Sequence, residues 1–235
     1  NWVEHQRRFS PKASLDKMYF YCSLFGNPQN KFSSIHVTGT NGKGSTVASL
    51  RSILRKAGLN VATFTSPYIT IFNERIQYND EFISNEDLLK YANIIIEKYP
   101  IIENSGYELP SFFEFITLLS FIYFSEITDL DIAIIEVGMG GRLDSTNVIN
   151  SDLSIITNVS YDHMNVLGDT LEKIAIEKLG IVKENTPLIC GIKENYLQEI
   201  VKNKCLEKNS DVILTALTAF EIKKMDIYGS EILIN

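Results

Sequence analysis

A glycine-rich segment near the N-terminus, HVTGTNGKGST at residues 36–46, restricts the fold more than any other feature of the sequence. Residues 34–37 form a short run that predicts a strand. After the segment, apolar residues recur at spacings of three and four, which predicts a helix over residues 45–57. Gly58 follows, where glycine commonly ends a helix. A strand, a glycine-rich loop and a helix in this order form the setting of a phosphate-binding loop, so the sequence predicts an α/β fold.

The residues of this loop suit a nucleotide phosphate. Glycines let the backbone approach phosphate closely, and free N–H groups at the helix N-terminus attract negative charge. Lys43 can reach the β- and γ-phosphates, and Ser45 or Thr46 can bring a hydroxyl near magnesium. The residues expected to bind ATP are Thr40, Asn41, Gly42, Lys43, Gly44, Ser45 and Thr46. In the common P-loop the lysine directly precedes Ser or Thr, whereas Gly44 intervenes here. A glycine-rich turn with a solvated lysine is the alternative.

The remaining chain alternates short apolar runs with helical patterns. Strands are expected at residues 34–37, 61–65, 132–137, 153–159 and 187–191, and helices at 45–57, 85–99, 111–126 and 170–184. This alternation predicts a doubly wound, mostly parallel sheet flanked by helices, with ligands beyond the carboxyl ends of the strands. The tail, from about residue 206 to residue 235, ends in alternating apolar residues, which predict a further strand with no terminal cap.

The composition is typical of one large globular domain. The chain has 235 residues, of which 45% are hydrophobic and 22% charged, and its formal net charge is −7. No apolar run is long enough for a membrane span, and the negative charge disfavours nucleic acid as a partner. Three widely spaced cysteines without a CxxC pair argue against a disulfide framework or structural zinc, so we expect a reducing, cytoplasmic location. We also expect a monomer.

Glu136 interrupts an almost continuously apolar run, DIAIIEVG, close to its carboxyl end. Such a run predicts a strand covered on both faces, where a lone carboxylate is costly to bury unless a metal or a cation lies beside it. Magnesium near the glycine-rich loop is the natural candidate. An ordinary strand-end glutamate that reaches solvent is the alternative.

Lys178 lies on the apolar stripe of a predicted helix. Its helical phase matches that of Leu171, Ile174, Ala175, Leu179 and Val182, so the side chain is expected to turn inward. A lysine that extends to the surface is the alternative. Asp169 is expected to cap this helix, with Glu172 three residues later.

Several motifs, in order along the chain, resemble those of folylpolyglutamate synthases and dihydrofolate synthases, members of the Mur ligase superfamily. TGTNGKGS resembles their ATP loop, in which a glycine follows the lysine. IIEVGMGGRLDSTNVI, NVSYDHMNVLG and EKLGI resemble further segments of the family, as do SPY, FNERI and SFFE. The resemblance covers roughly residues 30–195 and implies a Mur ligase-like ATP-binding domain.

This resemblance also implies roles for individual residues. Lys43, Lys178 and His163 are expected to act in catalysis, with Lys178 carbamylated by CO₂. Ser66 and Glu136 are expected to bind one magnesium ion, and His163 a second. The expected substrate-binding residues are Ser111, Phe113, Glu114, Arg142 and Asp144. Phe113 is expected beside the pterin ring, and Asp144 matches an aspartate that hydrogen-bonds to pterin in enzymes able to use dihydropteroate. A plain core role for Phe113 and an exposed turn for Asp144 are the alternatives.

The activity implied by the resemblance is ATP-dependent ligation. L-Glutamate would be added to tetrahydrofolylpolyglutamate, dihydropteroate or both through an acyl phosphate, with ATP and Mg²⁺ as cofactors. Because the chain lacks an initiator Met and its tail has no cap, residues 1–235 are expected to be an N-terminal ATP-binding domain, incomplete at its C-terminal end. The glutamate-binding domain is then outside this chain, which alone should not complete ligation. A P-loop module without ligase activity, or another Mur-type amide ligase, is the alternative.

Overall fold

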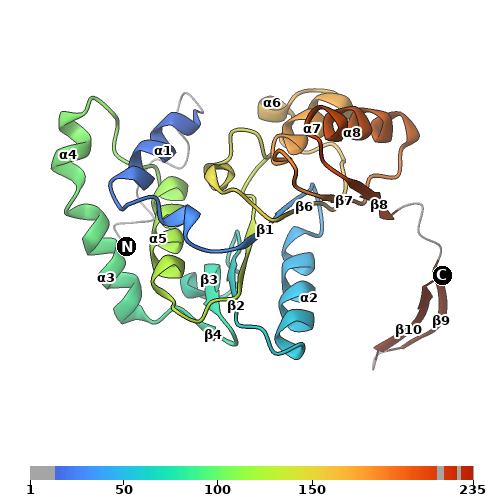
Figure 1. Ribbon diagram of the computed structural model, residues 1–235, viewed down its shortest axis with the longest axis horizontal. Coiled ribbons are helices and arrows are strands. Elements are labelled where there is room, and N and C mark those ends of the chain that lie inside the picture. Colours follow the sequence, from blue (N-terminus) through green and yellow to red (C-terminus); the bar gives the residue numbers. More distant parts are fainter. Residues whose placement is uncertain (1–13, 216–219, 227–228, 235) are drawn as a thin grey trace.

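An eight-stranded sheet forms the centre of the computed structural model, which describes residues 14–215, 220–226 and 229–234 (Figure 1). The strands are β1 (Ser34–Thr38), β2 (Val61–Phe64), β3 (Ile76–Tyr78), β4 (Glu81–Phe82), β5 (Ile132–Glu136), β6 (Leu153–Ile156), β7 (Leu188–Cys190) and β8 (Val212–Leu214). Their order is β4-β3-β2-β5-β1-β6-β7-β8. In this order, neighbouring strands are parallel from β2 through β5, β1, β6 and β7 to β8. β3 pairs antiparallel with β2, and β4 pairs antiparallel with β3, at one edge of the sheet. The predicted mostly parallel sheet is confirmed.

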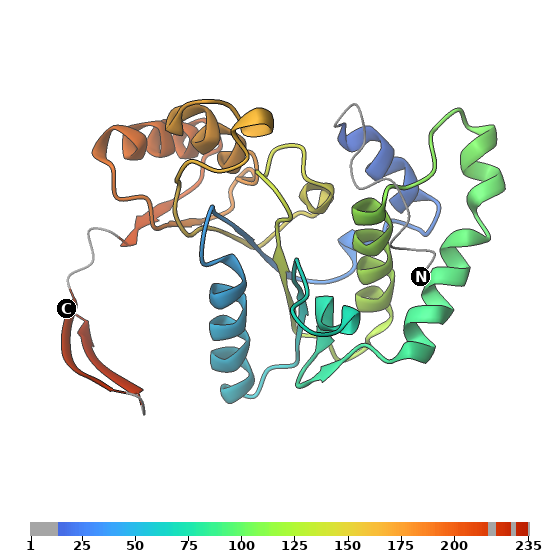
Figure 2. The same cartoon turned by 180° about the vertical axis from the view of Figure 1, so that it is seen from behind.

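Helices lie on both sides of the strands. They are α1 (Leu15–Ser23), α2 (Lys43–Lys56), α3 (Asn85–Ile96), α4 (Tyr99–Asn104), α5 (Phe112–Glu126), α6 (Met164–Leu167), α7 (Leu171–Leu179) and α8 (Asn195–Glu207). Figures 1 and 2 show α2 and α5 on opposite sides of the central strands, with α3 and α4 beyond α5. The doubly wound arrangement expected from the sequence is therefore present.

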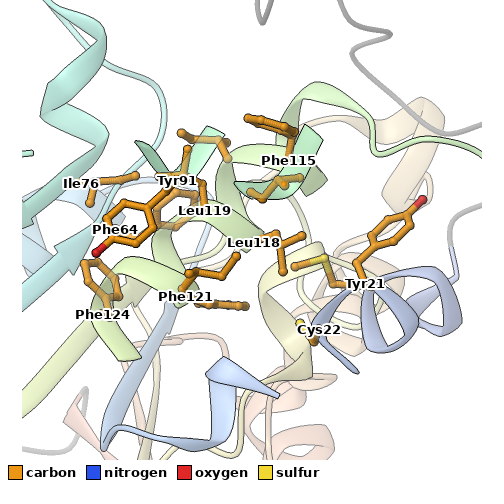
Figure 3. Close-up of a cluster of buried hydrophobic side chains, with 14 of the residues drawn as sticks. Tyr21, Cys22, Phe64, Ile76, Tyr91, Phe115, Leu118, Leu119, Phe121 and Phe124 are labelled. Carbon is orange, nitrogen blue, oxygen red and sulfur yellow. The ribbon is translucent and has the colours of Figure 1, made fainter. Parts of the chain in front are cut away.

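Side chains that alternate along the central strands build a separate core on each face. Val37 and Ile134 pack with Val47 of α2 on one face, whereas Ile135 faces the cluster around α5. Residues 115–122 of α5 are all buried, as expected for a helix that is apolar on every side. Figure 3 shows this cluster, to which β2 contributes Phe64 and α1 contributes Tyr21. The rigid sheet fixes where the loops at its carboxyl edge begin.

Several predicted boundaries need correction. The helix expected at residues 85–99 ends at Ile96, and α4 follows as a separate helix. The helix expected at residues 170–184 ends at Leu179, and its N-cap is Thr170, whose side chain accepts from Lys173 N. Asp169 instead forms an ion pair with the Lys173 side chain at 2.7 Å.

The strand expected at the end of the tail is present at residues 229–234, and further elements that were not expected precede it. Residues 195–207 form α8, β8 joins the edge of the main sheet, and β9 (Phe220–Asp226) and β10 (Gly229–Ile234) pair as an antiparallel hairpin. The expected absence of a cap at the end of the tail concerns residue 235, which lies outside the described residues. In the part of the chain that the structure describes, no helix has the length and apolarity that a bilayer crossing requires.

Candidate active site

The glycine-rich segment forms the predicted strand, loop and helix. Helix α2 begins at Lys43, two residues before the predicted start, so Lys43 and Gly44 belong to its first turn. First-turn amides have no acceptor within a helix and favour an anion at its N-terminus. Gly42 caps the helix with φ of +79°, a left-handed conformation that favours glycine. The Lys43 side chain lies across the loop, and its Nζ donates to the carbonyl oxygens of Gly39 (3.1 Å) and Thr40 (3.3 Å).

Residues that follow β6 hold the loop in place. The Thr40 N–H donates to Asn158 O (3.1 Å), and the Asn41 N–H donates to Asn158 Oδ1 (3.0 Å). Thr157 Oγ1 donates to Asn41 O (2.6 Å). Gly39 approaches Thr157 so closely, at φ of +153°, that a Cβ would lie 1.8 Å from this hydroxyl. The loop shape is therefore set by contacts with Thr157 and Asn158, which follow β6, as well as by its own glycines. The sequence motifs did not point to these two residues.

Glu136 is only 4% exposed at the carboxyl end of β5, so the alternative of a solvent-reaching glutamate is wrong. Its Oε2 accepts from the Ser66 N–H at 3.1 Å. Burial raises the pKa of Glu136, while the Ser66 N–H and the positive charges of Lys43 and Arg75 oppose this rise. A Cβ at Gly44 would lie 3.6 Å from Oε2. The intervening glycine thus leaves room between the carboxylate and α2, where a cation could bind.

Arg75 is a site residue that the sequence analysis did not single out. It is buried, and its Nη1 donates to Ser66 Oγ at 3.1 Å. The guanidinium carbon lies 5.2 Å from the ring centroid of Tyr68, 5.7 Å from that of Phe72 and 5.3 Å from that of Phe112. Cation–π attraction from three rings holds the guanidinium in place. Arg75 therefore orients the Ser66 side chain.

Lys178 points inward, as predicted from its helical phase, and is only 2% exposed. Its pKa is lowered from 10.5 to about 8, chiefly by burial and also by the charge of Lys43, while the charge of Asp162 opposes the change. The amine therefore interacts electrostatically with both the glycine-rich loop and the segment after β6. The neighbouring His163 is more than half exposed and lies 3.7 Å from Asp162 Oδ1.

A cavity of about 830 Å³ lies beside these groups. Its lining includes seven of the predicted site residues: Ser66, Ser111, Phe113, Glu114, Arg142, Asp144 and His163. The lining residues come from the loops after β2, β5 and β6 and from the helices α1, α5, α6 and α7. The folded chain thus gathers the five predicted substrate residues and two of the three predicted metal residues around one space, although these seven are separated by up to 97 positions in the sequence. Glu136 is not among the lining residues.

Asp144 is buried and not an exposed turn residue, so that alternative is wrong. Its Oδ2 accepts from the Met139 N–H at 2.9 Å, and its Oδ1 accepts from Thr146 N (3.0 Å) and Thr146 Oγ1 (2.5 Å). Burial raises the pKa of Asp144, and these hydrogen bonds oppose the rise. The carboxylate is fixed by the loop that carries it and still borders the cavity.

Phe113 combines the two roles that the sequence left open. Its ring borders the cavity and also packs against Phe64, with ring centroids 5.9 Å apart. It lies directly over Gly138, where a Cβ would be 2.5 Å from the ring. The absence of a side chain at Gly138 therefore determines where the Phe113 ring can lie.

The other predicted substrate residues already have protein partners. Ser111 and Glu114 cap α5 reciprocally: the Ser111 N–H donates to Glu114 Oε2 (2.7 Å), and the Glu114 N–H donates to Ser111 Oγ (3.4 Å). Arg142 forms an ion pair with Glu177, in which Nε (3.0 Å) and Nη2 (2.7 Å) both donate to Oε1. Arg142 also borders a second cavity, of about 860 Å³, which contains none of the other predicted site residues.

Comparison with known proteins agrees with this geometry. The Mur ligase middle domain matches residues 37–231. This chain belongs to the Mur ligase family. It is 41% identical over 204 residues to the dihydrofolate synthase/folylpolyglutamate synthase of Bacillus subtilis, a match that covers 87% of this chain and 47% of that protein. The resemblance inferred from the sequence motifs is therefore confirmed.

Solved structures of this Mur ligase group share the fold. The crystal structure of folylpolyglutamate synthase from Thermotoga maritima superposes with a TM-score of 0.89 at 33% identity, covering 98% of this chain and 52% of that one. A folylpolyglutamate synthase complex with AMPPCP and folate has a TM-score of 0.89 at 33% identity, covering 97% of this chain and 55% of that one. The chain spans about half the length of the relatives that it matches.

Proposed function

We propose that the protein containing this chain is an ATP-dependent ligase that adds L-glutamate to a folate-type acceptor. The observation that carries the proposal is the position of the 830 Å³ cavity: it is lined by Ser66, which contacts Glu136, and Glu136 in turn faces the first turn of α2. A phosphate on the glycine-rich loop and an acceptor in the cavity would then be neighbours. The solved complex of a relative with AMPPCP and folate supports this pair of ligands.

ATP would bind with its phosphates at the N-terminus of α2. The first-turn amides and Lys43 supply positive potential there, and the exposed Ser45 hydroxyl is better available than Thr46, whose Oγ1 donates to Gly42 O at 2.9 Å. Thr40 and Asn41 contribute the loop backbone that is held by Asn158. The chain's own role in phosphoryl transfer is positioning and charge neutralisation.

Magnesium is expected beside Glu136 and Ser66. Within residues 14–215, 220–226 and 229–234, no three His, Cys, Asp or Glu side chains form a ready-made metal cluster. Magnesium needs no such cluster, because it commonly keeps waters and phosphate oxygens together with one or two carboxylates. The buried Glu136 carboxylate and the space at Gly44 fit such an ion. When bound, the ion would neutralise the negative charge that develops on the phosphate during transfer. We assign a second magnesium ion to His163.

The cavity would hold the pterin end of the acceptor. Phe113 offers an aromatic face at its wall, and Asp144 offers a carboxylate that can accept from the amino group and ring N–H of a pterin. Arg142 and the capping pair Ser111 and Glu114 complete the polar lining. L-Glutamate is assigned to a domain outside this chain, and the protein is expected to act as a monomer.

The reaction proceeds in two transfers. An acceptor carboxylate oxygen attacks the γ-phosphorus of ATP, which forms a C–O–P linkage and releases ADP. The glutamate amino nitrogen then attacks the acyl carbon, forming the amide while the C–O bond to phosphate breaks and a proton leaves the nitrogen. The neutral Lys178 amine would attack CO₂ and lose a proton to solvent, and the resulting carbamate would place negative charge near Lys43, where the ammonium form of Lys178 is disfavoured. No step requires a covalent bond between substrate and protein.

Glutamate-dependent release of ADP from the full-length protein tests the proposal. Release is expected only when ATP, L-glutamate and either dihydropteroate or tetrahydrofolate are present together. A nucleotide-binding module without ligase activity would bind ATP with no requirement for the other two substrates. Another Mur-type amide ligase would need a different acceptor. ATP binding without dependence on the other substrates, or ligation to a different acceptor, would show that the proposed function is wrong.

A further inference from the structure

A buried chain of hydrogen bonds leads from β1 to the carboxylate of Asp144. His36 and Thr146 are both fully buried. His36 Nε2 lies 2.9 Å from Thr146 Oγ1, and this hydroxyl lies 2.5 Å from Asp144 Oδ1. His36 belongs to the motif before the ATP loop, yet alternation along β1 turns its side chain toward the loop after β5. Nothing in the proposed phosphate chemistry uses this histidine.

The direction of each hydrogen bond in this chain follows from the donors around Asp144. Both oxygens of Asp144 accept backbone N–H groups, from Met139 and Thr146, so the carboxylate acts as an acceptor. The Thr146 hydroxyl therefore donates its proton to Asp144 Oδ1, and its oxygen can accept from His36. Burial, followed by the charge of Lys183, lowers the pKa of His36 to about 3, so the ring is neutral. Its single proton must then be on Nε2.

The other ring nitrogen agrees with this assignment. Nδ1 of His36 is buried and has no hydrogen-bond partner among the described residues. A proton on Nδ1 would leave a buried donor unsatisfied. The unprotonated Nε2 would then face the Thr146 oxygen at 2.9 Å, although the only proton of that hydroxyl is already donated to Asp144. A buried donor without an acceptor is costly, whereas an acceptor without a donor is tolerated more often.

We infer that His36 is a positioning residue for Asp144, acting through Thr146 to hold the carboxylate at the cavity wall. The inference rests on the proposed function in one respect, namely that Asp144 contacts the acceptor. A second contact supports the same loop from the same strand, because Thr38 Oγ1 donates to Gly140 O at 2.6 Å. β1 thus fixes the loop at Gly140 and at Thr146, and Asp144 lies between these two points.

The tautomer can be measured without any ligand. Long-range ¹H–¹⁵N spectra of the ¹⁵N-histidine-labelled full-length protein should show a neutral His36 ring with the proton on Nε2, identified by its loss in His36→Gln. This pattern should persist from about pH 5.5 to about pH 8, because burial keeps the ring neutral. A proton on Nδ1, or titration within this range, would overturn the inference whether or not the protein binds a pterin.

The second experiment measures dihydropteroate binding by calorimetry. Loss of the relay in His36→Leu or Thr146→Val should weaken binding by about tenfold, the effect of one hydrogen bond lost. Thr146→Ser keeps the hydroxyl and should bind like the wild type, and His36→Gln, whose amide can still donate, should recover most of the loss. ATP affinity should not change in any of them.

Ser154→Ala is the matched control, since it removes a buried hydroxyl on β6 that donates to Ile181 O and leaves Asp144 untouched. A role confined to stability predicts that Ser154→Ala and His36→Leu behave alike, which would overturn the inference. If the wild type binds no dihydropteroate, the assignment of Asp144 to the acceptor is wrong. The ¹⁵N spectra then decide by themselves whether the His36 proton is on Nε2 and the hydrogen-bond chain to Asp144 is present.

Discussion

Replacing Lys178 with methionine should stabilise the protein near neutral pH while abolishing turnover. The folded chain lowers the pKa of Lys178 from 10.5 to about 8, chiefly by burial. Each pH unit of this difference corresponds to about 1.4 kcal/mol, so keeping the ammonium buried costs about 3 kcal/mol below about pH 8. Methionine has a similar length and carries no charge, so Lys178→Met avoids this cost.

The pH dependence has a definite sign. Between about pH 8 and about pH 10.5 the unfolded chain keeps the Lys178 proton that the folded chain has lost. The wild type therefore gains stability as pH rises through this window. The advantage of Lys178→Met should be about 3 kcal/mol near pH 7 and should fall toward zero near pH 10.5.

Urea unfolding in CO₂-free buffer measures this difference, because carbamate formation would otherwise change the charge of the wild type. Lys173→Met is the control: Lys173 lies on the same helix but is exposed and paired with Asp169, so its loss should have little effect at any pH. A variant Lys178→Met that is less stable than the wild type near neutral pH, or a difference that does not vary with pH, would refute the reasoning. Added bicarbonate should raise wild-type activity and leave the variant inactive.

Three further changes test separate parts of the site. Lys43→Ala should weaken ATP binding in calorimetry, because the loop loses its side-chain cation; an unchanged affinity would exclude the loop as the phosphate site. Glu136→Gln should make ATP affinity insensitive to Mg²⁺, and a retained magnesium response would show that the ion binds elsewhere. Gly138→Ala should lower stability by about 1–3 kcal/mol, because its Cβ would lie 2.5 Å from the Phe113 ring; an unshifted melting temperature would contradict this contact.

Local patterns in the sequence were enough to predict the core of the fold. The strand, loop and helix around residues 36–46 follow from short-range periodicity and glycine positions, and the inward direction of Lys178 follows from its helical phase. The carboxyl ends of parallel strands meet at one edge, so Glu136 could be expected near the glycine-rich loop, whereas the expectation for Ser66 came from the family resemblance. These features depend on spacing along the chain, which the sequence contains directly.

Other elements left weaker signals. β3 and β4 have three and two residues, too few for alternation to be recognised. Helix α8 was recognisable in principle, because Leu197, Val201 and Cys205 recur every four residues and are all buried. In the tail, alternating apolar residues predict a strand at its end, but they do not predict that β9 pairs with β10 in a hairpin.

Much of the site's chemistry depends on contacts between distant segments. The rings around Arg75 come from the loop after β2, from residues 72–75 and from α5. The hydrogen bonds that hold Asp144 join it to Met139 and, through Thr146, to His36. Periodicity along the sequence does not predict these contacts, because each contact depends on which strands lie next to each other in the sheet. Sequence reasoning therefore identified the residues at the site better than it identified their partners.

Transfer of oxygen from the acceptor to phosphate tests ligation through an acyl phosphate most directly. Dihydropteroate labelled with ¹⁸O in both carboxylate oxygens is incubated with the full-length protein, ATP, Mg²⁺ and L-glutamate, and the products are analysed by mass spectrometry. Attack of the carboxylate on the γ-phosphorus predicts one ¹⁸O in the released inorganic phosphate and one in the new amide. Phosphate that contains no ¹⁸O, accompanied by formation of the amide, would contradict the acyl phosphate.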